Sequence, residues 1–359
     1  MTLVSFVLGL TLLIVGAEFL VRGAAKLALT FGISPLVVGL TVVAFGTGSP
    51  EVAVSMQSAL SGQVDLAVAN VVGSNMFNVL FILGVSAMIT PLLVDRQLIR
   101  QEIPIMVGTS LLLAAMAWDG AISRVDGLIL TALLAAYTVF LIVQSRRFGA
   151  KPEDGTEDLP GAGSDWDSTV PVQAVLIVGG LALLIVGAQR LVGAAIAFAT
   201  YLGVSEMIIG LTIVAAGTSL PEVATSVMAA IRGQRDIAVG NVVGSNIFNI
   251  LGVLGLSAAI IPGGLVVAPA LLAFDIPAMV AVAIACLPIF FTGNLIARWE
   301  GAVFFGLYIA YTVYLILAAK QHDALSTYSF VLGTVVLPLC ALTIAVIAWR
   351  EWQSRHPTS

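Results

Sequence analysis

Residues 39–55 read GLTVVAFGTGSPEVAVS, and this stretch decides the fold because it returns 171 residues later, at 210–226, as GLTIVAAGTSLPEVATS. The match runs without a gap from 39–78 to 210–249, where 26 of 40 positions are identical. Each copy ends in a second motif, ANVVGSNMFN or GNVVGSNIFN. The duplication predicts two equivalent halves that each carry the same pair of motifs.

Shorter matches extend the repeat over most of the chain. Upstream, LLIVGAEFLV corresponds to LLIVGAQRLV, and downstream EIPIM corresponds to DIPAM. RVDG and AYTVFLI correspond to RWEG and AYTVYLI at an offset of 174 residues. Five apolar segments in each half are thereby paired.

The composition places the chain in a membrane. Of its 359 residues, 59% are apolar and only 10% are charged, and the mean hydropathy is +1.08. Soluble chains contain about 25% charged residues. Apolar segments of about 20 residues, enough to cross a bilayer, follow one another almost continuously. We therefore predict an all-α polytopic membrane protein that lies in the lipid bilayer of the cell (inner) membrane. No nucleic-acid partner is expected.

Polar breaks divide the apolar sequence into eleven predicted spans: 3–21, 35–60, 66–90, 103–118, 125–144, 172–196, 206–230, 237–262, 275–293, 300–319 and 328–349. The predicted domains are a first repeat at 1–145, an acidic cytoplasmic linker at 146–171, a second repeat at 172–320, and an additional C-terminal transmembrane helix with a cytoplasmic tail at 321–359. Because five spans per repeat is an odd number, the second repeat is expected to enter the membrane inverted relative to the first.

Basic residues support this inversion, because cytoplasmic loops collect lysine and arginine. An N-terminus outside and a C-terminus in the cytoplasm place twelve of the fifteen basic residues on the cytoplasmic side. Arg232 and Arg235 also occupy the positions of Ser61 and Val64 in the first copy. Matched loops with different charge are expected to face opposite sides of the membrane.

Each copy carries one carboxylate inside an apolar segment, Glu51 or Glu222, directly after a proline. An ionisable group within a membrane is costly and indicates function. The preceding proline removes a helical N–H and is expected to break the helix, which frees the carbonyl of Gly46 or Gly217. Two such carboxylates near the midplane, about 4 Å apart, repel by about 4 kcal/mol at an effective dielectric constant of about 20. A cation or a proton must offset this repulsion, because neither motif contains lysine or arginine.

Oxygen-bearing residues recur at four-residue spacing around these acids. Thr47 precedes Glu51 by four, Thr218 precedes Glu222 by four, and Ser74–Asn78 and Ser245–Asn249 repeat the spacing, so each pair is expected to share a helix face. Such hard ligands suit Ca²⁺, which takes six to eight oxygens, and also Na⁺. The nearby Ser55, Ser226, Asn75 and Asn246 are interpreted as packing residues. The single cysteines, Cys286 and Cys340, and the two histidines lack metal-ligand spacing, which disfavours zinc and copper.

The paired motifs GTGSPE/GTSLPE and GSNMFN/GSNIFN resemble the two repeats of the cation/calcium exchanger superfamily, specifically its prokaryotic-type sodium/calcium exchangers. The resemblance covers about the first 320 residues. It implies Na⁺/Ca²⁺ antiport by alternating access, in which one helix pair slides across the other eight, and no resident cofactor. It also implies eleven ion ligands: Ala44 and Ala215 through their carbonyls, and Thr47, Glu51, Ser74, Asn78, Thr218, Ser219, Glu222, Ser245 and Asn249 through side chains.

Two positions depart from the family pattern. Gly48 stands where the family has serine, as Ser219 does in the second copy, so one sodium ligand is expected to be missing or replaced by Ser49 or water. Asn249 stands where many relatives have aspartate. Potassium-dependent relatives rely on an acid there, so potassium dependence is disfavoured.

Three alternatives lead to different expectations. A calcium/proton antiporter would use the same carboxylates and follow pH rather than Na⁺. A cation channel would conduct without coupling. An intramembrane hydrolase would need an aspartate pair with a GxGD motif, or a serine with an intramembrane histidine, and the sequence has neither. The protein is therefore not expected to be an enzyme.

Overall fold

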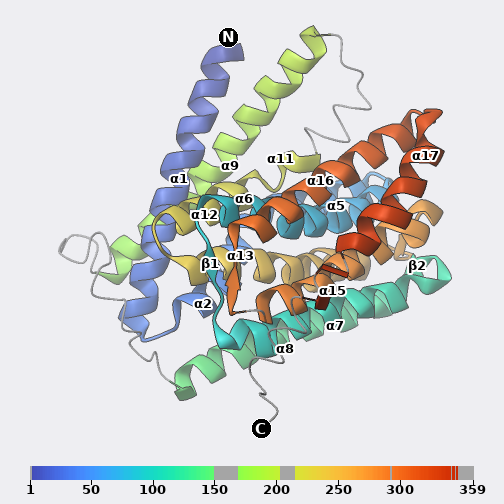
Figure 1. The fold of residues 1–359 in the computed structure, drawn as a ribbon. Coiled ribbons are helices and arrows are strands. Elements are labelled where there is room, and N and C mark those ends of the chain that lie inside the picture. The colour runs from blue at the N-terminus through green and yellow to red at the C-terminus, as the bar shows by residue number, and fades with distance from the viewer. Residues whose placement is uncertain are drawn as a thin grey trace.

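The computed structural model describes residues 2–148, 169–202, 215–291, 293–340, 342–343 and 345–346 (Figure 1). Most of the predicted linker, residues 149–168, lies outside the described residues, and so does the predicted tail from residue 347 onward.

Both halves fold into the same order of elements. The first half contains α1 (Thr2–Phe31), α2 (Pro35–Val38), η1 (Gly39–Val43), α3 (Ala44–Thr47), α4 (Ser49–Leu60), α5 (Val64–Phe77), η2 (Asn78–Leu83), α6 (Gly84–Ile89), β1 (Leu92–Leu93), η3 (Leu98–Glu102), α7 (Ile103–Met116), η4 (Ala117–Asp119), β2 (Ala121–Ile122) and α8 (Arg124–Phe148). The rest contains α9 (Val170–Tyr201), α11 (Ala215–Gly217), α12 (Leu220–Ile231), α13 (Arg235–Phe248), η8 (Asn249–Leu254), α14 (Gly255–Ile260), β3 (Leu265–Val266), η9 (Leu271–Asp275), α15 (Ile276–Phe291), β4 (Leu295–Ile296), α16 (Arg298–Ala319), α17 (Ala324–Val331) and η10 (Leu332–Val336).

The prediction of a helical, polytopic membrane protein is confirmed. The described residues contain eight helices long and apolar enough to cross a bilayer, or nine when one bent pair is counted as a span. Three of the eleven predicted spans, 206–230, 275–293 and 328–349, include residues outside the described ranges. Their full lengths therefore remain predictions.

The helix break expected before Glu51 is confirmed. Pro35–Thr47 and Ser49–Leu60 are bent by 43° at Gly48. The second copy is interrupted at the same place, because α11 ends at Gly217 and α12 begins at Leu220. Pro50 and Pro221 lie in the first turn of α4 and α12, where the missing N–H of proline costs no hydrogen bond.

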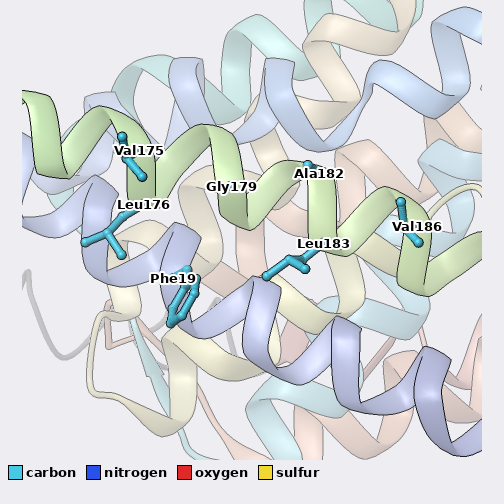
Figure 2. Close-up of a pocket in the computed structure, with 7 residues that line it drawn as sticks. All are labelled: Phe19, Val175, Leu176, Gly179, Ala182, Leu183 and Val186. Carbon is cyan, nitrogen blue, oxygen red and sulfur yellow. The ribbon is translucent and has the colours of Figure 1, made fainter.

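Helices α1 and α9 lie side by side at one edge of the molecule and cross the direction of the remaining helices (Figure 1). Glycines hold them close: Gly9 faces Gly187, and Gly16 faces Gly180. This order means that the two helices run antiparallel. Their outer surface carries an apolar groove of about 460 Å³, lined by Phe19 of α1 and by one face of α9 (Figure 2).

Short antiparallel ladders join the halves, a detail that the sequence did not predict. β1 pairs with β4, and β2 pairs with β3, so that Leu92 lies opposite Ile296 and Ala121 opposite Val266. In the sequence repeat, β1 corresponds to β3 and β2 to β4. The two ladders are therefore equivalent contacts with the halves exchanged.

One hydrogen bond between a tyrosine and a carboxylate occurs at the equivalent place in each half. The Tyr137 hydroxyl donates to Glu102 at 2.7 Å, and the Tyr311 hydroxyl donates to Asp275 at 2.8 Å. Each pair ties the start of α7 or α15 to α8 or α16. These four residues correspond to one another in the sequence repeat, so the similarity of the halves extends to side-chain contacts.

Candidate ion-binding site

The carboxylates of Glu51 and Glu222 lie at the N-terminal ends of α4 and α12, and each residue is only 1% exposed. The positive end of a helix dipole favours a carboxylate at this position. The two carboxylates are close enough to interact electrostatically. Since no lysine or arginine occurs among the buried residues that the structure describes, no protein cation balances them.

Glu51 is bound by the opposite half of the chain. The Ser219 hydroxyl donates to Glu51 Oε1 at 2.9 Å and lies 3.2 Å from Ser74 Oγ. Thr218 approaches Glu51, and Thr47 approaches Glu222. The bend at Gly48 lies between Thr47 and Glu51, and each threonine approaches the carboxylate of the other half. That Thr47 and Glu51 share a helix face stays a prediction.

Six buried oxygens of the predicted site have no hydrogen-bond partner in the described part of the chain. They are Glu51 Oε2, Asn78 Oδ1, Thr218 Oγ1, Glu222 Oε2, Ser245 Oγ and Asn249 Oδ1. Buried polar atoms normally have partners, so such a cluster calls for one. Every member is an oxygen that can accept a proton or coordinate a hard cation.

The remaining predicted ligands lie at the helix breaks. Ala44 begins α3 and is buried, and its carbonyl accepts from the N–H of Gly48 at 3.0 Å. The backbone of Ala215 begins α11, and its side chain lies outside the described residues. Asn78 and Asn249 begin the π-helical segments η2 and η8. Such local widening of a helix occurs frequently at functional sites.

The site consists of two carboxylates and neutral oxygens. In the part of the chain that the structure describes, no three histidine, cysteine, aspartate or glutamate side chains come together. Carboxylate and neutral oxygen donors suit a hard cation.

Ser49 does not take the place of the serine missing at position 48. Its hydroxyl is exposed and donates within its own segment, at 2.8 Å from the Gly46 carbonyl oxygen. This bond satisfies the carbonyl that Pro50 was expected to free. The Gly46 carbonyl thus has a hydroxyl partner in place of the N–H that Pro50 lacks, and the exposed Ser49 hydroxyl is engaged there rather than at the carboxylates.

The ring of Phe248 leaves no room for a side chain at position 48. A β-carbon built on Gly48 would lie 2.9 Å from Phe248 Cδ1 and 3.0 Å from the Ala44 carbonyl oxygen. Phe248 also stacks on Phe45, with ring centroids 4.6 Å apart. The ring of Phe248 thus occupies the space that a serine side chain at position 48 would need.

We expect Gly48→Ala to destabilise the protein by about 1–3 kcal/mol through overpacking. The matched control is Gly73→Ala, since a β-carbon on Gly73 meets nothing within 4 Å. Melting temperatures of the purified variants in detergent check this. The combination of Gly48→Ala with Phe248→Leu should recover part of the loss, and equal melting temperatures for Gly48→Ala and Gly73→Ala would contradict the explanation.

Sequence reasoning missed Asn241 as a neighbour of the site. This fully buried side chain lies 3.2 Å from the Thr47 hydroxyl through Oδ1 and donates to Ser226 at 2.9 Å. Its repeat equivalent, Asn70, donates to Ser55 at 3.0 Å. The sequence did contain a signal for this contact, because the asparagine and the serine are each identical in the two copies of the repeat.

Comparison with known proteins identifies related chains. A family model described as "Sodium/calcium exchanger protein" matches residues 1–143 and 172–317. The inner membrane protein YrbG of Escherichia coli (strain K12) is 40% identical over 257 residues, which cover 72% of this chain and 79% of that protein. The sodium/calcium exchanger MaX1 of Methanosarcina acetivorans is 32% identical over 339 residues, covering 86% of this chain and 96% of the relative.

A solved structure is similar over nearly its whole length. The sodium-calcium exchanger NCX_Mj, soaked with zero Na⁺ and Ca²⁺, superimposes with a TM-score of 0.74 at 30% sequence identity. The match covers 88% of this chain and 98% of that chain.

Proposed function

Because the chain belongs to the sodium/calcium exchanger protein family, we propose that it exchanges Na⁺ for Ca²⁺ across the membrane, with Glu51 and Glu222 as carboxylate ligands shared by both ions. The protein is an integral membrane transporter rather than an enzyme. The observation that carries the proposal is the cluster of buried, unpartnered oxygens around two carboxylates that no basic side chain neutralises.

The chemistry of the cluster favours cation exchange. Two carboxylates about 4 Å apart repel by about 4 kcal/mol at an effective dielectric constant of about 20, so the site is stabilised when positive charge is bound. One Ca²⁺ balances both charges, and Na⁺ ions can balance them separately. The proposed ligands are those implied by the family resemblance, and the six unpartnered oxygens belong to that set. Competition for the same carboxylates couples the two ions.

We further propose that residues 1–145 and 172–320 are inverted repeats joined by the linker 146–171, with the N-terminus outside and residues 321–359 appended. The antiparallel packing of the equivalent helices α1 and α9 supports the inversion. The exchanged ladders β1·β4 and β2·β3 support a two-fold relation between the halves. YrbG is described as an inner membrane protein, which favours the same membrane for this chain.

A salt bridge connects the α1/α9 pair to the rest of the molecule. Glu18 of α1 accepts from Arg232 Nε, at the end of α12, at 2.8 Å. The repeat equivalents of these two residues are Gln189 and Ser61, which are uncharged. We propose that α1 and α9 are the helix pair that slides during alternating access, in which case the salt bridge stabilises only one of the two alternating conformations.

Glu18→Gln should therefore shift the conformational equilibrium away from the state described here. Exposed salt bridges contribute at most about 1 kcal/mol, so the expected shift is about five-fold or less. Distance distributions between spin labels on α1 and α12 would measure it. Adding Arg232→Ser should produce no further shift, and a distribution unchanged by Glu18→Gln would contradict this role.

The proposed exchange is tested by ⁴⁵Ca²⁺ uptake into proteoliposomes loaded with Na⁺, K⁺ or choline, with and without a pH gradient. Uptake that requires internal Na⁺ is the expected result. Uptake driven by the pH gradient alone would replace the proposal with calcium/proton antiport. Uptake independent of every imposed gradient would replace it with a channel.

A further inference from the structure

Hydrogen bonds link four asparagines in a row across the two halves, in the order Asn78, Asn246, Asn75 and Asn249. Each of the four is at most 3% exposed. Asn75 corresponds to Asn246 in the sequence repeat, and Asn78 corresponds to Asn249. This asparagine network therefore contains the same two positions from each half.

The bonds within the asparagine network cross from one half to the other. Asn78 Nδ2 donates to Asn246 Oδ1 at 3.0 Å, and Asn249 Nδ2 donates to Asn75 Oδ1 at 3.1 Å. These two bonds are equivalent with the halves exchanged. Asn78 is thus oriented by the second half, and Asn249 by the first.

Asn75 and Asn246 are themselves held in place by their amide nitrogens. Asn75 Nδ2 donates to the backbone carbonyl oxygen of Asn246 at 3.3 Å, and Asn246 Nδ2 donates to the backbone carbonyl oxygen of Asn75 at 3.4 Å. Each Nδ2 also contacts a methionine sulfur, Met279 at 3.6 Å or Met106 at 3.5 Å. Both N–H groups of each amide are thereby used. The Oδ1 of Asn75 is left to accept from Asn249, and the Oδ1 of Asn246 is left to accept from Asn78.

The orientation decides which atom Asn78 and Asn249 offer to an ion. A side-chain amide has an oxygen that accepts and an NH₂ group that donates, and only the oxygen can coordinate a cation. Here the Nδ2 of each donates to an asparagine of the other half, while Asn78 Oδ1 and Asn249 Oδ1 are buried without a hydrogen-bond partner in the described part of the chain. If either amide were rotated by 180°, its NH₂ group would take the place of the oxygen, and an NH₂ group cannot coordinate a cation bound by the carboxylates.

We propose that Asn75 and Asn246 are positioning residues of the ion site, which fix the amides of Asn249 and Asn78 across the interface so that both present oxygen to the ion. The inference rests on the proposed function. It replaces the packing role that the sequence suggested for these two residues. Partners that orient metal ligands typically change affinity 10–100-fold when removed.

A double-mutant cycle tests the cross-half pairing. Calorimetric titration with Ca²⁺ in the absence of Na⁺ gives the dissociation constant of each purified variant. Asn75→Ala is expected to weaken Ca²⁺ binding about 10-fold or more. Because it acts through Asn249, it should add little when Asn249→Ala is already present, whereas its effect should multiply with that of Asn78→Ala.

The control is Gln144→Ala, since the Gln144 amide exchanges hydrogen bonds with Gln101 and belongs neither to the asparagine network nor to the proposed ligands. It is expected to keep the wild-type affinity. Asn75→Asp, which retains an acceptor for Asn249, should retain more affinity than Asn75→Ala. The equivalent cycle with Asn246 and Asn78 gives an independent reading if Asn75→Ala does not fold.

The outcomes separate the inference from the proposed function. Wild-type protein that binds no Ca²⁺ would overturn the proposed function. Wild-type binding combined with an unchanged affinity of Asn75→Ala, or with equal effects of Asn75→Ala in the presence and absence of Asn249, would overturn the positioning role alone. Coupling of Asn75 with Asn249 and of Asn246 with Asn78 would support it.

Discussion

Glu51→Gln and Glu222→Gln are each expected to abolish Na⁺-dependent Ca²⁺ uptake while the protein remains folded. Glutamine keeps the size of the side chain and removes the charge that the ion balances. Loss of residues that merely orient metal ligands costs 10–100-fold in affinity, so loss of a carboxylate ligand should cost at least about 100-fold. The measurement is ⁴⁵Ca²⁺ uptake into proteoliposomes loaded with Na⁺.

The melting temperature gives the same prediction a second readout. Ca²⁺ should raise the melting temperature of the wild-type protein, because a ligand that binds only the folded state stabilises it. It should not raise that of either glutamine variant. Without Ca²⁺, the variants should melt no lower than wild type, since one of two repelling charges is gone. The control is Asp65→Asn, an exposed acid in the first turn of α5, and substantial uptake in either glutamine variant would contradict the site.

Gly180→Leu is expected to prevent α1 and α9 from packing and to eliminate transport. A β-carbon on Gly180 would already lie 2.7 Å from the Leu20 backbone nitrogen and 2.8 Å from the Gly16 carbonyl oxygen. Neither backbone atom can move without separating the helices. Gly180→Ala should therefore lower stability by about 1–3 kcal/mol, and the larger leucine by more.

The adjacent glycine provides a matched control. A β-carbon on Gly179 meets nothing within 4 Å, and Gly179 lines the open apolar groove between α1 and α9 (Figure 2). Gly179→Ala and Gly179→Leu should keep transport and should melt no lower than wild type, because alanine gains about 1 kcal/mol in helix propensity over glycine. Similar losses at positions 179 and 180 would contradict the proposed importance of close helix contact.

Composition predicted the membrane class, apolar length predicted most helices, and the repeat supplied the candidate residues of the site. Apolar length fixes a span, and the proline before Glu51 fixes the break, because both depend only on local sequence. The pairing of Ser219 with Glu51 could not be predicted in this way. A repeat identifies equivalent residues in each half, but the contacts between halves depend on how the halves pack.

Spacing of four residues predicts neighbours only along one helix. The bend of 43° at Gly48 lies between Thr47 and Glu51, and the approach of Thr47 to Glu222 of the second half could not be predicted from spacing. The bonds of Asn75 and Asn246 could not be predicted either, because their partners lie in the opposite half.

The most direct test of the account is whether Na⁺ and Ca²⁺ compete for one site. Calorimetric titration of the purified protein with Ca²⁺ should be carried out without Na⁺ and at increasing Na⁺, with K⁺ at equal ionic strength as the control. The account predicts that the dissociation constant for Ca²⁺ rises with Na⁺ and not with K⁺, and that Glu51→Gln removes the binding. Ca²⁺ binding that is unaffected by Na⁺ would contradict a shared carboxylate site.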